Sequence, residues 1–339
     1  MFNFVFSVIQ SNQKILLWFL FTLMVGSAFL LHATLFQSPT ANEDIFYLYQ
    51  DGKSIVSGEN PYSRIHEGNM RENQKYSTYL PLFYLLSAAT QKIGLKSFDL
   101  WIAFWRILFL IFTAGSGVLI FSHFLSRDLP LAGFLFSGFW LFNRWTLHLS
   151  KIVQIDGMAL FFFLLALILF PKKNDGLAFF FLGLSLAVKQ MAVFAFPLFF
   201  LTLTGFEKKD LIRKMGFLML VPFVSSLPFI LWDFSGFVKS ILFSATRVPA
   251  DHFGVPSADS IMGLVGLPAK IPLITGLLLV YILAFRKRLS LFTGVFLSFT
   301  LFIDFNSVLF RQYLVWPAAT LALAASCWME SHYTSASCC

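Results

Sequence analysis

The residues best suited to chemistry are three acidic side chains that follow the first long apolar run of the chain. Glu43, Asp44 and Asp51 lie among aromatic residues in the stretch NEDIFYLYQDG. A carboxylate can take the proton of a hydroxyl group as that group attacks another molecule. Because Asp44 and Asp51 recur at helical spacing, we expect an amphipathic helix over residues 44–56 at a membrane interface. A simpler role for Glu43 and Asp44 is to place negative charge in the first turn of that helix, where the dipole favours it.

Positive charge on the expected outer side of the membrane departs from the positive-inside pattern and suggests an anionic ligand. Lys189 follows the Gly-containing apolar segment GLAFFFLGLSLAV. An ionisable residue at membrane depth normally lines a polar cavity or has a partner, so Lys189 is a strong candidate. The alternative is one long helix with Lys189 extending to the surface. The other cations expected on the outer side are Arg64, Arg311, Arg144 and Lys151.

The composition places these residues in a membrane protein. Of the 339 residues, 58% are hydrophobic and 12% are charged, and the mean hydropathy is +0.75, which is far above that of a soluble domain. The long Phe/Leu runs lack the alternation of a barrel strand. We therefore expect an all-α, polytopic transmembrane helical bundle. The net charge of +8 is typical of basic cytoplasmic loops and gives no support to nucleic-acid binding.

The basic loops fix the expected sidedness. Short Lys/Arg-rich loops at residues 171–175, 206–214 and 285–290 should lie in the cytoplasm, together with both termini. This gives about ten spans. Two of them are short and meet near Lys189, between the loops at residues 171–175 and 206–214. The other expected spans are residues 15–36, 100–125, 129–145, 157–170, 215–232, 271–285, 289–303 and 313–328.

Two long outer segments then remain, at residues 37–99 and 233–270. Within the first, residues 79–96 would put the later loops on the wrong side if they crossed the membrane. We expect them to be re-entrant or interfacial, although a spanning helix stays open. No internal repeat or linker divides the chain, so residues 1–339 should form a single transmembrane domain.

An ordered set of motifs carries a family resemblance. These motifs are EDIFYLYQDGKSIVSGENPYSR, YSTYLPLFYLL, FWLFNRWTLHLSKIVQIDGMALFFFLLALILFPKK, GLAFFFLGLSLAVKQMAVFAFPLFF and FNSVLFRQYLVWPAATLAL. In this order the chain resembles GT-C superfamily integral membrane glycosyltransferases. It looks most like polyprenyl-phosphate-mannose-type mannosyltransferases and the catalytic subunit of GPI mannosyltransferase. The resemblance extends from near residue 43 to near residue 323.

The resemblance implies an inverting transfer of a hexose, with mannose expected, from a polyprenyl-phosphate donor to a lipid or glycan acceptor on the outer face. Asp44 matches the general base of the family. The relatives nearest to GPI mannosyltransferase have Asp-x-Asp at this site, whereas Asn42-Glu43-Asp44 keeps only the second Asp. The implied donor-phosphate and substrate-binding residues are Arg64, Lys189, Arg311, Asp51, Tyr79, Gln154, Asp156, Gln190 and Tyr313.

Some of these residues have a second interpretation. Gln154 and Asp156 match a Gly-Gln/Asn-x-Asp turn, with Val153 in place of the Gly, and could hold sugar hydroxyls or cap the span that follows. Tyr79 could bind substrate or anchor the chain at the interface. His148 and His252 are further candidates for substrate contact. The sequence indicates no cofactor and no metal ligand set, and it leaves dependence on a divalent metal open.

Two other functions compete with transfer. A multi-pass transporter or flippase of lipid-linked sugars would also have a polar outer cavity, but it needs polar or broken helices that reach the midplane. A non-catalytic subunit that binds a lipid-linked sugar is the third alternative. For the transferase, the expected partners are a polyprenyl-phosphate sugar donor, a lipid or glycan acceptor and membrane lipids. The location would be the inner membrane in a bacterium or the ER membrane in a eukaryote.

Overall fold

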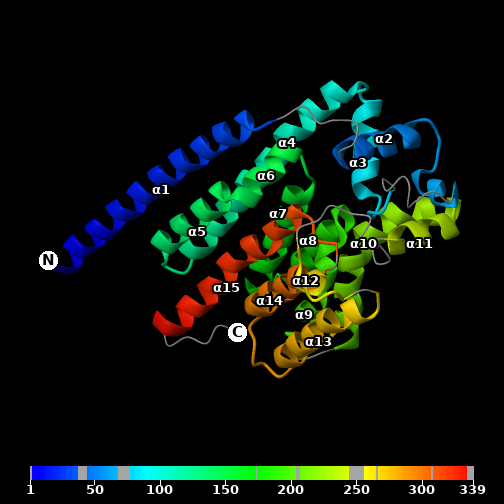
Figure 1. The fold of residues 1–339 in the computed structure, drawn as a ribbon. Coiled ribbons are helices and arrows are strands. Elements are labelled where there is room, and N and C mark those ends of the chain that lie inside the picture. Colours follow the sequence, from blue (N-terminus) through cyan, green and yellow to red (C-terminus); the bar gives the residue numbers. More distant parts are fainter. Residues whose placement is uncertain are drawn as a thin grey trace.

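The computed structural model is all-helical over the residues that it describes, which confirms the all-α part of the prediction (Figure 1). These residues are 2–36, 44–67, 77–172, 174–203, 207–243, 256–264, 266–306 and 308–333. Within them, four helical segments are long and apolar enough to cross a membrane. They lie in α1 (Phe2–Thr34), in α4 (Phe98–Leu125), in α10 (Lys208–Trp232) and in the segment Pro268–Phe285, which contains η5 (Pro268–Lys270) and α13 (Ile271–Phe285).

The other segments predicted to span are helical as well, but they do not meet both criteria. Several have 13 or 14 residues, which is about 20 Å of helix and less than the ~30 Å hydrocarbon core of a bilayer. The count of ten spans therefore stays a prediction. The helices that were predicted to span but are not candidate spans are α5 (Pro130–Phe142), α7 (Asp156–Leu169), α8 (Asp175–Val188), α9 (Phe196–Leu201), α14 (Leu291–Asp304) and α15 (Val315–Tyr333).

The break predicted at Lys189 is present. The backbone of Lys189 is extended, with φ −153° and ψ 129°, between α8 and the short helix η3 (Gln190–Phe194). The ring centroids of Phe179, near the start of α8, and Phe200, near the end of α9, are 4.8 Å apart. The chain therefore turns back at Lys189, and a single long helix through this residue is excluded.

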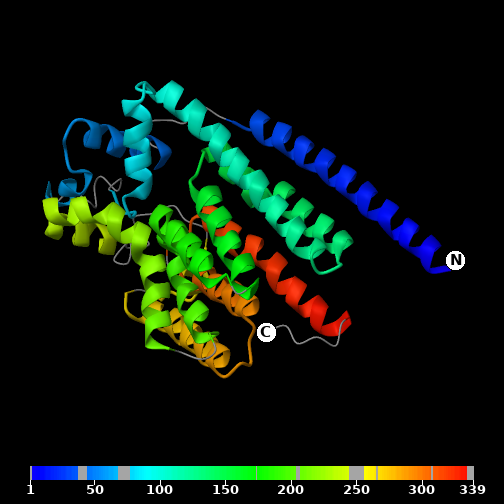
Figure 2. The same cartoon turned by 180° about the vertical axis from the view of Figure 1, so that it is seen from behind.

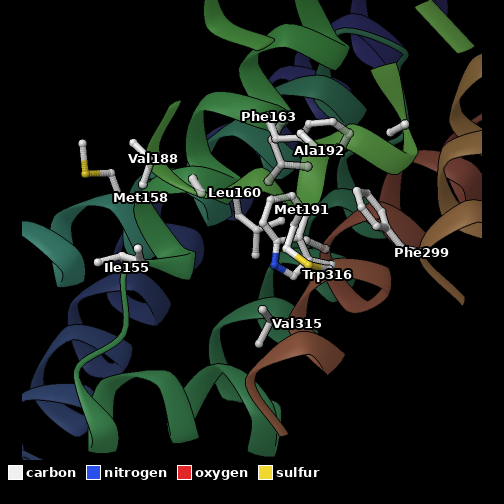
Figure 3. Close-up of a cluster of buried hydrophobic side chains, with 14 of the residues drawn as sticks. Ile155, Met158, Leu160, Phe163, Val188, Met191, Ala192, Phe299, Val315 and Trp316 are labelled. Carbon is white, nitrogen blue, oxygen red and sulfur yellow. The ribbon is translucent and has the colours of Figure 1, made fainter. Parts of the chain in front are cut away.

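Helix α7 lies at the centre of the bundle, where it packs against α4, α8 and α15. Most of its side chains are buried. Figure 3 shows the apolar cluster that α7, η3, α14 and α15 build around Trp316. The ring of Trp316 lies 5.7 Å from that of Phe163 and 5.1 Å from that of Phe299. This region is dry and densely packed, so any charge placed in it needs a partner.

The outer segment forms a separate layer at one end of the molecule. It contains α2 (Asp44–Val56), which has the predicted boundaries, and α3 (Leu82–Lys92), which packs along it. Gly52 permits this packing because a Cβ atom there would collide with the side chain of Ser87. Helix α3 has 11 residues, about 16 Å, and is not among the candidate spans. Whether residues 79–96 cross the membrane stays a prediction, because other short helices outside the candidate spans were predicted to cross it.

Helix α11 (Phe234–Phe243) and the short helix η1 (Pro61–Glu67) complete this layer. His66 of η1 pairs with Asp233, the residue between α10 and α11, at 2.9 Å. Figures 1 and 2 show the layer at the end opposite the N-terminus and the α4–α5 turn. The second outer segment also contains α12 (Ala258–Ile261). Residues 244–255, which include the predicted contact His252, lie outside the described residues.

Candidate functional site

The candidate base Asp44 is joined to the turn before α7. Asp44 begins α2 and is half-buried. Gln154 donates a hydrogen bond from Nε2 to Oδ2 of Asp44, with a distance of 3.3 Å. Gln154 follows α6 (Arg144–Ile152) and Val153, whose backbone is left-handed at φ 53° and ψ 72°. A β-branched residue such as Val153 is strained in that conformation. The strained turn thus brings the Gln154 side chain to α2.

A second carboxylate, Asp156, is closed into an ion pair inside the bundle. Lys189 Nζ lies 2.6 Å from Oδ2 of Asp156, and the two side chains are 2% and 0% exposed. Trp316 donates from Nε1 to Oδ1 of Asp156 at 2.9 Å. The carboxylate of Asp156 therefore binds Lys189, at the end of α8, and Trp316 of α15, and it does not cap α7. In this structure Lys189 neutralises a protein carboxylate and does not face an open phosphate site.

Several predicted site residues surround this pair. The Nζ atom of Lys189 lies 5.5 Å from the ring centroid of Tyr79 and 5.3 Å from that of Tyr313, which are distances of a cation–π interaction. Gln190 donates from Nε2 to the carbonyl oxygen of Thr78 at 2.7 Å. The structure thus brings the predicted site residues Tyr79, Gln190 and Tyr313 together with Lys189, where they enclose a salt bridge.

Asp51 lies in the outer layer rather than in the bundle. Its side chain is buried, and Arg64 Nη1 is 3.9 Å from Oδ1. Burial raises the pKa of Asp51 to about 7, while a hydrogen bond from Ser77 and the charge of Arg64 act in the opposite direction. The pKa values of the nearby phenols Tyr62 and Tyr84 are raised by burial and then by this carboxyl group. Arg64 is therefore placed with Asp51.

A chain of hydrogen bonds connects this layer to the bundle. Tyr62 donates from Oη to the carbonyl oxygen of Tyr79 at 2.7 Å, and the backbone N–H of Tyr79 donates to Tyr84 Oη at 3.1 Å. The ring of Tyr79 then contacts Lys189. Residues 77–79 are therefore the bridge between the two groups of predicted site residues.

Four residues form a cationic patch at the surface of the protein: Arg144, His148 and Lys151 of α6, and Arg311 at the start of η6 (Arg311–Leu314). Arg144, Lys151 and Arg311 are exposed. The pKa of His148 is lowered by burial and then by the charges of Arg311, Lys151 and Arg144. Over the part of the chain that the structure describes, no carboxylate lies within ion-pair distance of these cations. The patch is thus suited to an anion from outside the protein.

Two features of the site were not predicted. Helix α6 lies in a stretch that we expected only as an outer loop, although the spacing of Arg144, His148 and Lys151 at i, i+4 and i+7 indicates one helical face. Trp316 has no signal in the sequence because it lies within an apolar run. Among the described residues, no group of three His, Cys, Asp or Glu side chains could hold a metal ion; Glu43 lies outside them.

Comparisons of the chain with protein-family models, with curated proteins and with solved structures found no match. The function therefore has to be inferred from the arrangement of these residues.

Proposed function

We propose that this protein is a membrane glycosyltransferase that transfers a hexose, with mannose expected, from a polyprenyl-phosphate donor to a hydroxyl group of a lipid or glycan acceptor. The observation that supports this most is the contact between Asp44 and Gln154. It brings a half-buried carboxylate on α2 to the end of α6, the helix that carries most of the cationic patch. The short helix α6 therefore carries most of the anion-binding surface, and the turn after it contacts the proposed base.

The proposed step is a direct displacement at the anomeric carbon. The acceptor oxygen forms a bond to this carbon while the bond between the carbon and the phosphate oxygen breaks. Asp44 takes the proton of the acceptor hydroxyl, and the electron pair of the broken bond stays on the phosphate. The cations Arg144, Lys151 and Arg311 stabilise the charge that develops there. A single displacement inverts the configuration at the anomeric carbon.

The proposal includes the GT-C-like topology of about ten spans, with both termini in the cytoplasm. The short helices α5, α7, α8 and α14 then cross within a bundle that long helices surround. The outer layer, with α2 and α3, lies at the membrane interface, where a lipid-linked sugar arrives. In a bacterium this face is the periplasmic side of the inner membrane, and in a eukaryote it is the lumenal side of the ER membrane.

A transporter of lipid-linked sugars is the second candidate, and the helix break at Lys189 favours it. Discontinuous helices with ionisable residues build substrate sites in transporters. Here, however, the charge at the break is matched by Asp156 at 2.6 Å. The unmatched cations lie at the outer surface, which is the arrangement that transfer at one face requires.

The test is a transfer assay in membranes with radiolabelled polyprenyl-phosphate-mannose, in which wild type is compared with Asp44→Asn. We expect the variant to lose about 100-fold or more of the transfer rate, because it lacks the base. Asp99→Asn is the matched control, since Asp99 also lies in the first turn of a helix, α4, and is exposed. If Asp44 acted only on the helix dipole, both changes would have the same small effect.

The remaining outcomes separate the alternatives. Undiminished transfer by Asp44→Asn would remove Asp44 as the base. If wild type transfers nothing but moves the lipid-linked sugar across reconstituted vesicles, the protein is a transporter. Binding of the lipid-linked sugar with neither transfer nor transport would identify a non-catalytic subunit.

A further inference from the structure

The carboxamide of Gln154 has one atom in use and one that still needs a hydrogen bond. The side chain is buried, and its Nε2 atom donates to Asp44 Oδ2 at 3.3 Å. The nitrogen has to be the atom near Asp44, because an amide oxygen would repel a carboxylate. The Oε1 atom is buried and accepts no hydrogen bond from any residue that the structure describes. A buried acceptor in this state is costly unless a water molecule satisfies it.

A small pocket lies beside Gln154. Its volume is about 10 Å³, which is about the space that one water molecule needs and is too small for a sugar ring or a phosphate. Arg106 of α4 lines the same pocket. The Cζ atom of Arg106 lies 5.3 Å from the ring centroid of Phe36, and its Nε atom is buried. An arginine donates hydrogen bonds and never accepts them, so α4 brings a donor to the pocket.

Ser150 of α6 also lines the pocket and brings a second acceptor. Its Oγ atom lies 2.5 Å from Nδ1 of His32, and Nε2 of His32 lies 2.8 Å from the carbonyl oxygen of Leu141. A carbonyl oxygen only accepts, so Nε2 carries the proton. His32 is buried within a candidate span, where charge is costly. In the neutral ring Nδ1 accepts from the Ser150 hydroxyl, whose hydrogen is then in use and whose oxygen remains an acceptor.

We propose that the pocket holds one ordered water molecule, through which Arg106 holds Gln154, and with it the Asp44 carboxylate, in position for transfer. The water accepts from Arg106 Nε and donates its two hydrogens to Gln154 Oε1 and Ser150 Oγ. Water matches this set, whereas a substrate hydroxyl has one hydrogen for two acceptors and an ammonium group cannot accept from an arginine. The effect on transfer rests on the proposed function, but the water site does not.

The direction of the hydrogen bonds explains why Arg106 matters to a base that it reaches only through two other groups. Because Arg106 only donates, it turns a lone pair of the water toward itself and the hydrogens toward Gln154. The water then donates to an oxygen, which keeps Oε1 in the pocket and Nε2 at Asp44. A carboxamide that was free to turn would also present Oε1 to the carboxylate and repel it. Arg106 is therefore a positioning residue.

A high-resolution structure of the full-length protein in lipid nanodiscs tests the water site directly. We expect a single peak of density within hydrogen-bond distance of Gln154 Oε1, Arg106 Nε and Ser150 Oγ. A map that shows ordered water elsewhere in the protein but no peak here would overturn the inference. So would density that extends beyond a single atom, because it would identify a larger ligand.

Two substitutions of Arg106 separate its donor group from its charge. Arg106→Gln keeps a nitrogen donor at the position of Nε along the side chain and removes the charge, whereas Arg106→Met places a methyl group there. In the transfer assay, we expect kcat to fall about 10-fold in Arg106→Met, the effect of one lost hydrogen bond in a buried network. In Arg106→Gln it should stay within about 2-fold of wild type, because the hydrogen bond is kept. The KM for the polyprenyl-phosphate donor should not change in either variant.

A double variant tests whether this effect passes through Gln154. In the Gln154→Leu background, Arg106→Met should lower kcat no further, because Leu cannot pass the orientation of the water on to Asp44. Arg127→Met is the matched control. Arg127 is a half-buried arginine that follows α4 and pairs with Glu330, so any loss that it causes through packing should be the same in both backgrounds.

The failures can be told apart. An equal loss of kcat in Arg106→Gln and Arg106→Met would overturn the inference, because the charge and not the donor would then act. An additive loss in the double variant would overturn it as well, and a raised KM for the donor would instead place Arg106 at the phosphate. In these cases the transferase proposal stands. Absence of transfer by wild type, with the water peak present, would overturn the proposed function and leave the water site standing.

Discussion

The bundle interior and the cationic patch at α6 treat charge in opposite ways. In the interior, Asp156 and Lys189 form a contact of 2.6 Å, and Trp316 occupies the second carboxylate oxygen. In the outer layer, buried Asp51 has its cation, Arg64, at 3.9 Å. The patch around α6 presents its cations to the surface. Charge is thus matched in the buried pairs and left unmatched in the exposed patch, where a ligand can arrive.

This difference separates two kinds of residue that look alike in the sequence. Lys189 and Arg311 were both predicted to bind a phosphate. The interior cation is committed to a partner within the protein, whereas the outer cation remains accessible. A cation that already pairs with a buried carboxylate of the protein is not suited to bind an anion from outside. The residue type alone does not reveal this difference.

The largest effect is expected when the matched pair is broken. Lys189→Met leaves the carboxylate of Asp156 buried without its cation, and we expect it to lower the free energy of unfolding by about 3–5 kcal/mol. Denaturant unfolding in detergent micelles measures this change. The double variant Lys189→Met/Asp156→Asn should recover more than half of the loss, because no charge remains and Asn can still accept from Trp316.

Lys151→Met is the control for this comparison. It removes a lysine of the exposed patch and should change the free energy of unfolding by less than about 0.5 kcal/mol. If the two lysine variants lose the same stability, the distinction between interior and outer charge is wrong.

The next effect depends on pH and concerns Asp51. Its pKa is raised from 3.8 to about 7 in the folded protein, so the folded state holds the proton more tightly than the unfolded state. Stability contributed by this group is therefore present below pH 4 and is lost as the pH rises to 7, by an amount on the order of 4 kcal/mol. We expect Asp51→Asn to flatten this part of the profile and to stabilise the outer layer above pH 7.

Thermal unfolding between pH 4 and pH 8 measures this dependence. Asp99→Asn removes an exposed carboxylate near the same layer and should leave the profile unchanged. The stability of wild type could instead rise between pH 4 and pH 7, with Asp51→Asn removing the rise. This result would mean that Asp51 is held as a carboxylate, as in the ion pair of the bundle interior.

The smallest effects are expected at the cationic patch, where water and salt screen each charge. Arg144→Gln, Lys151→Gln and Arg311→Gln should each raise the KM for the polyprenyl-phosphate donor about 2- to 5-fold at low salt, with less change at high salt. Unfolding stability should not change. Lys92→Gln, an exposed lysine of α3, serves as the control. An effect on KM that does not depend on salt would contradict an electrostatic role for the patch.

Local features of the fold could be predicted from the sequence. The apolar and polar spacing predicted α2 with its observed boundaries, because a short amphipathic helix is determined by its own residues. The break at Lys189 was also predictable, since two legs had to return between two basic loops. The number of spans could not be settled in this way, because helices of 14 residues are shorter than the bilayer core.

The partners within the site were much harder to predict. Asp156 and Lys189 are 33 residues apart, and Asp156 and Trp316 are 160 residues apart. Their contacts depend on how α7, α8 and α15 pack, and no local pattern records this packing. The contact of Asp44 with Gln154, across 110 residues, has the same origin. Residue types therefore pointed to the charged and amide residues but not to Trp316, and tertiary packing determined which of them meet.

The ion pair in the bundle also constrains how the chain enters a membrane. Asp156 at the start of α7 precedes Lys189 after α8, so the acid is synthesised first and reaches the lipid before its partner exists. A lone charge at that depth is expensive, whereas α7 and α8 inserted together carry none in excess. Biosynthesis is therefore expected to release α7 and α8 as one hairpin. Loss of Lys189 should then reduce the amount of protein that inserts as well as the stability of what does.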